Sequence, residues 1–113
     1  MDAPKVLYAA RHILAVPQWD VANPGSPKTK LAPSAAFGQL LRQHRLKQKM
    51  SQDALAARAG YERAFISLVE LGKTNPSLRS IFDLCAALNV KPSVFLRSVE
   101  KLANFELPPP TRR

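Results

Sequence analysis

The chain has 113 residues, and its 17 Lys and Arg against 8 Asp and Glu give a formal net charge of +9 at pH 7. This length fits a single domain, and the charge fits a polyanionic partner, although a basic protein without such a partner has the same composition. The single cysteine, Cys85, excludes an internal disulfide and a cysteine-only zinc site, and no apolar run reaches membrane-spanning length.

Residues 1–33 are expected to form an N-terminal arm and linker. Residues 6–16 suit a short helix or a strand, but prolines at positions 17, 24, 27 and 33 interrupt any regular element that follows. Two interpretations remain open for this segment. It is either a mobile tail or an arm that lies along DNA or packs on a partner subunit.

The first predicted helix covers residues 34–47, with Ser34 as its N-cap and Phe37, Leu40 and Leu41 on its apolar face. Arg45 falls on or near this inward face, where an unpaired charge would be costly. The helix therefore needs an acidic partner for Arg45 elsewhere in the chain.

Residues 51–72 carry the strongest local pattern. Ser51 suits the N-cap of a helix that ends at Gly60, because glycine takes the left-handed turn conformation at little cost. A second helix restarts near Glu62, with Ile66 and Val69 facing inward. Helix, glycine turn and helix together predict a helix-turn-helix, whose second helix can lie in the major groove of DNA.

Two more helices are expected after Gly72. Asn75 and Pro76 suit the start of the first, and its apolar stripe is expected to comprise Leu78, Ile81, Phe82, Cys85 and Leu88. Pro92 opens the second, in which Phe95 seals the core. Residues 104–113 form a proline-rich tail that ends all helix.

An ordered set of residues between positions 36 and 96 is found without insertion or deletion. The set comprises Arg45, Ser51-Gln52, Leu55-Ala56, Gly60, Ile66-Ser67, Glu70, Gly72-Lys73, Asn75-Pro76-Ser77-Leu78 and Ala87-Leu88. It resembles the lambda-repressor/Cro-type (XRE-like) helix-turn-helix family. The resemblance implies an all-α, compact five-helix DNA-binding domain over residues 34–103, between the arm of residues 1–33 and the tail of residues 104–113.

The resemblance also implies roles for residues outside the reading face. It pairs Arg45 with Glu70 near the end of the recognition helix, as a structural ion pair. It places Gln52 at the phosphate backbone, where this side chain can also brace the recognition helix. Further candidates for phosphate contact, each of which can instead be an ordinary surface residue, are Arg42, Lys73 and Thr74.

Base reading is expected from the outward face of the second helix of the motif. Arg63 can make a bidentate contact to guanine, and Ser67 can reach a base or a phosphate. Ala64 and Leu68 depart from the polar residues common in the family; they can meet a thymine methyl or stay silent, and Leu68 can pack partly inside. Glu62 can accept from a cytosine amino group or serve only at the helix start.

The expected function is that of a sequence-specific transcriptional regulator in the bacterial cytoplasm, associated with the nucleoid. One such module contacts few bases, so a homodimer on palindromic double-stranded DNA is expected. The surplus apolar residues Val99, Leu102 and Phe105 are its candidate dimer interface, unless they cover a larger core. A restriction-modification controller and an antitoxin-type autoregulator are alternatives of the same class.

A protein-interaction module built on the same helices is the alternative from another class. The loss of polarity at Ala64 and Leu68 favours it, whereas Arg63 and the positive charge of the domain oppose it. No motif predicts an enzyme, a metal site, a cofactor or a small-molecule ligand.

Overall fold

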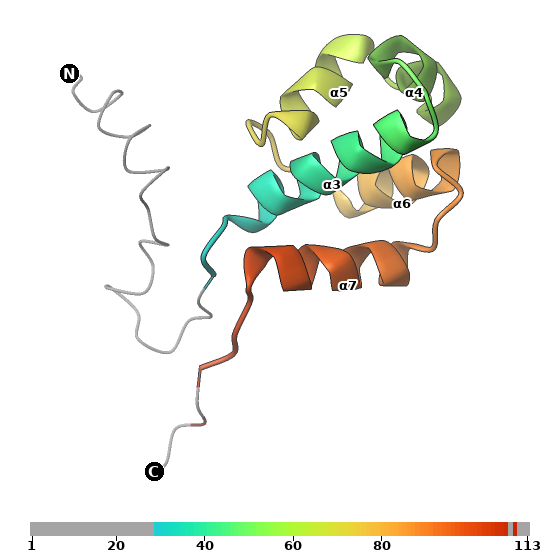
Figure 1. Ribbon diagram of the computed structural model, residues 1–113. Coiled ribbons are helices and arrows are strands. Elements are labelled where there is room, and N and C mark those ends of the chain that lie inside the picture. The colour runs from blue at the N-terminus through green and yellow to red at the C-terminus, as the bar shows by residue number, and fades with distance from the viewer. Residues whose placement is uncertain (1–28, 109, 111–113) are drawn as a thin grey trace, which may run out of the picture.

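The computed structural model describes residues 29–108 and 110, and within them it has five α-helices. They are α3 (Pro33–Lys47), α4 (Gln52–Ala59), α5 (Arg63–Glu70), α6 (Leu78–Ala87) and α7 (Pro92–Ala103). In Figure 1, α3 crosses the middle of the fold, with α4 and α5 on one side and α7 on the other. The all-α, five-helix class expected from the sequence is confirmed, whereas the expectations for residues 1–28 and 111–113 lie outside the described residues.

Two helix starts differ from the sequence prediction. Ser34 does not cap the first helix, because α3 already begins at Pro33, and no side chain caps it. A proline at the first helical position has no N–H to satisfy and a preset φ, so this start needs less help from a cap. Asn75 does not cap α6 either. Ser77 does, and its Oγ accepts a hydrogen bond from the Ser80 backbone N–H at 3.0 Å.

The core draws side chains from all five helices. Its largest fully buried members are Phe95, Leu41, Leu55, Ile66, Leu84, Leu88, Val69 and Cys85. On α6 the expected apolar stripe is wrong in part, because Leu78 is 67% exposed and Phe82 is 53% exposed. The sequence of α6 allows two helical faces, and contacts with α4 and α7 select the face that buries Leu84.

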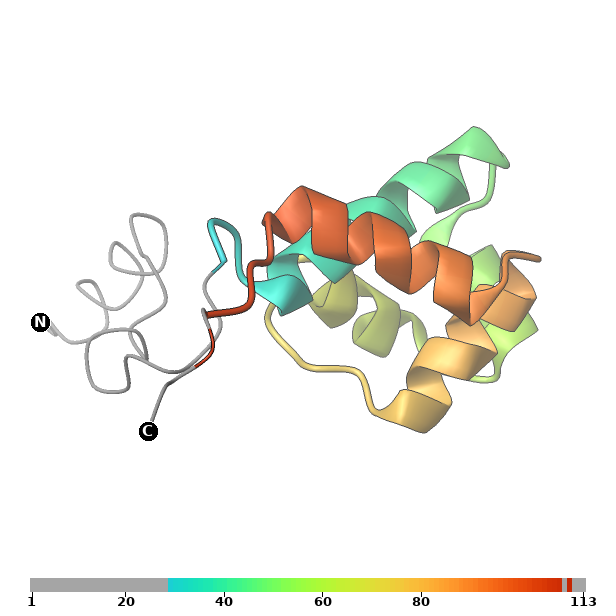
Figure 2. The ribbon, with the colours of Figure 1, turned by 90° about the horizontal axis from the view of Figure 1, so that it is seen from below.

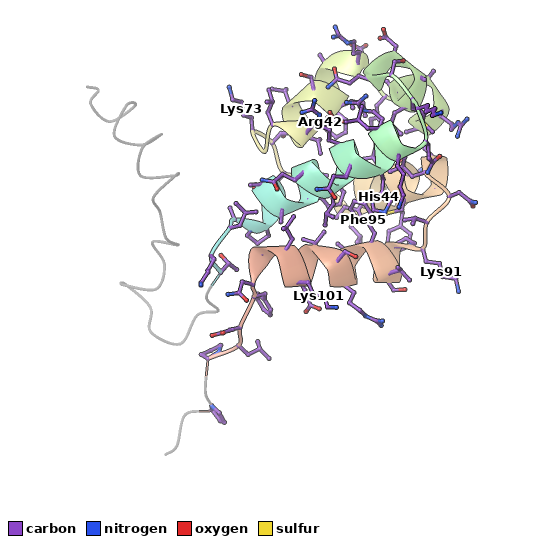
Figure 3. The ribbon with its side chains drawn as sticks, viewed as in Figure 1. Arg42, His44, Lys73, Lys91, Phe95 and Lys101 are labelled. Atoms are coloured by element: carbon purple, nitrogen blue, oxygen red, sulfur yellow. The ribbon has the colours of Figure 1, made fainter. Side chains whose placement is uncertain are left out.

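An aromatic cluster joins α3 to α7. The rings of Phe37 and Phe95 meet edge to face with centroids 5.0 Å apart, and the His44 ring lies 5.2 Å from Phe95. Figure 3 shows His44 and Phe95 close together, where α3 passes over α7, and Figure 2 shows α7 crossing in front of α3. Full burial of one such side chain stabilises the fold by roughly 2–3 kcal/mol. Phe95 therefore seals the core, as the sequence predicts.

Close contact between α3 and α5 depends on Gly38. A Cβ added at this position would overlap the Val69 carbonyl oxygen and lie 2.7 Å from the Glu70 carbonyl oxygen. The last turn of α5 thus lies directly on the α3 backbone, where only a residue without a side chain fits. This contact fixes the end of α5 relative to α3, and Arg45 lies on the same helix two turns later.

Candidate nucleic-acid interface

The helix-turn-helix consists of α4 and α5, and Gly60 sets the turn between them. Ser51 Oγ accepts from the Ala54 backbone N–H at 3.0 Å and caps α4, as predicted. Gly60 has a φ of 84° and a ψ of 31°, the left-handed conformation expected for it. The backbone N–H groups of Gly60 and Tyr61 both donate to the Ala56 carbonyl oxygen, at 2.8 and 2.9 Å. The chain therefore turns within three residues before α5 begins.

A contact that the sequence prediction missed holds this turn against α6. The rings of Tyr61 and Phe65 stack with centroids 4.8 Å apart. The Tyr61 hydroxyl donates to Asp83 Oδ2 at 2.7 Å and lies 3.1 Å from Ser80 Oγ. Phe65 is half-buried. No local signal links Tyr61 to a carboxylate 22 residues later, because only tertiary packing brings them together.

The two faces of α5 have opposite character. Ile66 and Val69 are completely buried against the rest of the domain. On the other face, the Arg63 side chain is 65% exposed, Leu68 is 43% exposed, and Ala64 is exposed as well. Ser67 lies half-buried between them, and Glu62 is exposed at the N-cap without a capping hydrogen bond from its side chain.

A buried polar network fastens α3 and α4 to the end of α5. Arg45 donates through Nε to Glu70 Oε2 at 2.6 Å and through Nη2 to Oε1 at 2.9 Å, and its Nη1 donates to the Met50 carbonyl oxygen at 2.9 Å. Gln52 Nε2 donates to Glu70 Oε1 at 3.0 Å. The hydrogen bonds to Glu70 raise the pKa of the Arg45 guanidinium, although burial opposes this. One carboxylate thus receives hydrogen bonds from two helices.

The candidate phosphate contacts come from three elements around α5. Arg42 on α3 and Lys73 after α5 are exposed, whereas Gln52 and Thr74 are half-buried. In Figure 3, Arg42 and Lys73 lie on the side of α3 that carries α5, and Lys91 lies at the start of α7 on the other side. The structure therefore brings Arg42 and Lys73 to the same side of α3 as α5.

The residues expected at a dimer interface lie at the end of α7 and just beyond it. Leu102 is 37% exposed and Phe105 is 36% exposed, whereas Val99 is only 7% exposed and packs mainly into the core. Val99 and Phe105 line a groove of about 500 Å³ beside α7, together with Leu96 and Ala103. Any contribution of Val99 to a contact between subunits is confined to the floor of this groove.

Residues 29–108 contain neither a membrane-spanning helix nor a cluster of metal-ligand residues. No helix in this range is long and apolar enough to cross a membrane. No group of three or more His, Cys, Asp or Glu residues in this range is placed to hold a metal ion.

The sequence pattern of a known family covers the elements that build this surface. The helix-turn-helix family model matches residues 41–95, from the middle of α3 into the first turn of α7. The control protein C.BamHI of Bacillus amyloliquefaciens is 44% identical over 61 residues, which are 53% of this chain and 75% of that protein. The chain belongs to the Cro/CI-type helix-turn-helix family. The family match includes every candidate base and phosphate contact, and it ends before the candidate dimer residues.

Two further helix-turn-helix proteins resemble the present chain over most of their own length. An uncharacterized HTH-type transcriptional regulator of Archaeoglobus fulgidus is 35% identical over 63 residues, which are 55% of this chain and 89% of that protein. The crystal structure of the restriction-modification controller protein C.AhdI from Aeromonas hydrophila aligns with a TM-score of 0.54 and 37% identity. The alignment covers 60% of this chain and 97% of the controller chain.

Proposed function

We propose that this helix-turn-helix protein is a transcriptional regulator that binds a palindromic operator in double-stranded DNA as a homodimer. The observation that carries the proposal is the exposed face of α5, which begins at Arg63, while the opposite face is buried at Ile66 and Val69. A helix held in this way can enter the major groove without moving the rest of the domain. The protein would act on DNA in the cytoplasm, and the proposal includes no catalytic step and no small-molecule ligand.

Arg63 is the principal base-reading residue in this proposal. It is the first residue of α5, and its contact with Asp53 Oδ1 is 4.0 Å long between side chains that are 65% and 79% exposed. So exposed and distant a pair holds a guanidinium only weakly, and Arg63 is free to turn toward guanine O6 and N7. Ser67 and Glu62 flank it as further polar candidates for base contact.

Phosphate contacts would fix the register of α5 in the groove. Gln52 gives one N–H to Glu70, and its second amide hydrogen remains for a phosphate oxygen. The exposed charges of Arg42 and Lys73 would displace counterions, so affinity must fall steeply as the salt concentration rises. Thr74, next to Lys73, adds a hydroxyl donor at the same end of α5.

Dimerisation would place two copies of α5 at half-sites about one helical turn apart, roughly 34–36 Å. Leu102 and Phe105 provide the exposed apolar surface for this contact, with Val99 beneath them. The same surface lies outside the residues that match the family model, which end at position 95.

Control of a restriction-modification system is the narrower function that we favour within this class. It is supported by the likeness to C.BamHI over 75% of that protein and to C.AhdI over 97% of its chain. The test is a footprint on the DNA upstream of the protein's own coding sequence and of any adjacent endonuclease or methyltransferase gene. Protection of a symmetrical site there supports a controller, and protection only upstream of a toxin gene assigns the protein to the antitoxins instead.

Selection of bound sites from a random duplex pool at physiological salt tests the general proposal. An inverted repeat with half-sites about one turn apart is the expected result, and Arg63→Ala should relax the preference at one guanine and cost ~1–3 kcal/mol. Arg79→Ala is the matched control, because this arginine of α6 is 84% exposed and lies outside the reading face. Recovery of no motif, or equal effects of the two variants, would refute the assignment and favour a protein-interaction module.

A further inference from the structure

The exposed face of α5 is mainly apolar, which is unusual for a surface that meets DNA. Ala64 and Leu68 of α5 and Leu71, its C-cap residue, follow one another at i, i+4 and i+7, so they form a single row along this side. Leu68 is 43% exposed and Leu71 is 63% exposed. Apart from Arg63 and the half-buried Ser67, α5 places no other polar side chain beside this row.

Nothing within the domain explains this row as packing. The core needs only the opposite face of α5, where Ile66 and Val69 are completely buried. In Figure 1, α5 lies at the outer edge of the helices, on the far side of α3 from α7. Exposed apolar side chains stabilise a complex only when apolar groups of a partner cover them. We therefore expect a partner surface with apolar groups at this row.

The major groove offers one kind of apolar group at the base edges. Apart from ring C–H groups, the rest of each edge consists of hydrogen-bond donors and acceptors, and the apolar group that projects into the groove is the methyl at C5 of thymine. A cytosine methylated at C5 presents the same group at the same ring position. We propose that Ala64, Leu68 and Leu71 select 5-methylpyrimidines in the operator, beside the guanine read by Arg63. This inference rests on the proposed function, because it names the chemistry that α5 reads.

The spacing of the row fits this chemistry. Ala64 and Leu68 are about 6 Å apart along the helix axis, at 1.5 Å per residue. This separation is close to two base-pair steps of about 3.4 Å each. The row therefore fits two methyl groups that lie about two base pairs apart.

The test uses the motif obtained by site selection and changes single methyl groups. Each thymine in turn is replaced by deoxyuridine, which removes only the methyl, and each cytosine by 5-methylcytosine, which adds it. Loss of one buried methyl should weaken binding about fourfold, and the same exchange in both half-sites about 15-fold. A loss on uracil exchange identifies thymine as the source of the methyl, and a gain on cytosine methylation identifies 5-methylcytosine.

Leu68→Ser connects the effect to the row. In this variant the uracil penalty at one position should disappear, while the preference for the guanine read by Arg63 remains. Leu107→Ser is the matched control, since this leucine is 74% exposed and lies beyond α7. The control should keep the full penalty.

Three negative outcomes are distinguishable. A selected motif that tolerates every methyl exchange without a change in affinity refutes the inference and leaves sequence-specific binding in place. A penalty that persists in Leu68→Ser refutes the assignment to this row. Failure to select any motif refutes the proposed function itself, and the inference fails with it.

Discussion

Replacement of Glu70 by leucine removes the carboxylate on which the contact between α3, α4 and α5 depends. Arg45 is only 7% exposed, and two of its nitrogens donate to Glu70, at 2.6 and 2.9 Å. Without the carboxylate, the guanidinium stays buried with the Met50 carbonyl oxygen as its remaining partner. We expect Glu70→Leu to lower the free energy of unfolding by ~3–5 kcal/mol, because one buried charge is left unpaired.

Arg45→Met should cost a similar ~3–5 kcal/mol, since it leaves the Glu70 carboxylate buried with only the Gln52 amide as a donor. The double variant Arg45→Met with Glu70→Leu removes both charges and keeps apolar volume. Its loss should therefore be much smaller than the sum of the two single losses, with a coupling energy of ~3 kcal/mol or more.

Urea denaturation followed by circular dichroism at neutral pH measures all four proteins of this cycle. Because the pair is buried, moderate salt should change the coupling energy little. A single variant that loses less than about 1 kcal/mol, or losses that simply add in the double variant, would show that the pair does not hold the helices together.

Three further variants test other parts of the structure. Gly38→Ala should destabilise by ~1–3 kcal/mol in thermal or urea unfolding, although Ala is normally the better helix residue, because its Cβ would overlap the Val69 carbonyl oxygen; a stabilised variant would contradict the close contact. Burial raises the pKa of the Cys85 thiol to about 11. The contribution of this protonated thiol to stability is therefore fully present below about pH 8.5 and is lost as the pH rises through 11. Between about pH 8 and pH 10 the wild type should lose ~1–2 kcal/mol more than Cys85→Ala, and parallel profiles would contradict the burial of this thiol. Lys73→Ala should weaken binding to all sequences alike and reduce the salt slope by about one, and a changed base preference would instead make Lys73 a reading residue.

Much of the candidate interface follows from local sequence. Ser51 and Gly60 specify the start and the end of α4 through their own chemistry, one as a side-chain cap and the other as a left-handed residue. Spacing alone identifies Ile66 and Val69 as the inward side of α5. The outward side, with Arg63 at its start, follows by exclusion. Such signals are reliable because each acts within one or two helical turns.

Local sequence does not predict the correct N-cap or the correct buried face where two nearby residues are equally favourable. Asn75 and Ser77 are both favourable N-caps, and the path from α5 to α6 decides for Ser77. Leu78 and Phe82 fit an apolar stripe as well as Leu84 does, and packing against α4 and α7 decides for Leu84.

The sequence by itself determined the five-helix class, the position of the turn and the face of α5 that points outward, because helical periodicity and capping are properties of neighbouring residues. Only the tertiary structure decided how the turn between α4 and α5 meets α6. It stacks Tyr61 on Phe65 and brings the Tyr61 hydroxyl within hydrogen-bonding distance of Asp83. Such contacts depend on how whole helices pack, and the residues that form them carry no signal of one another along the chain.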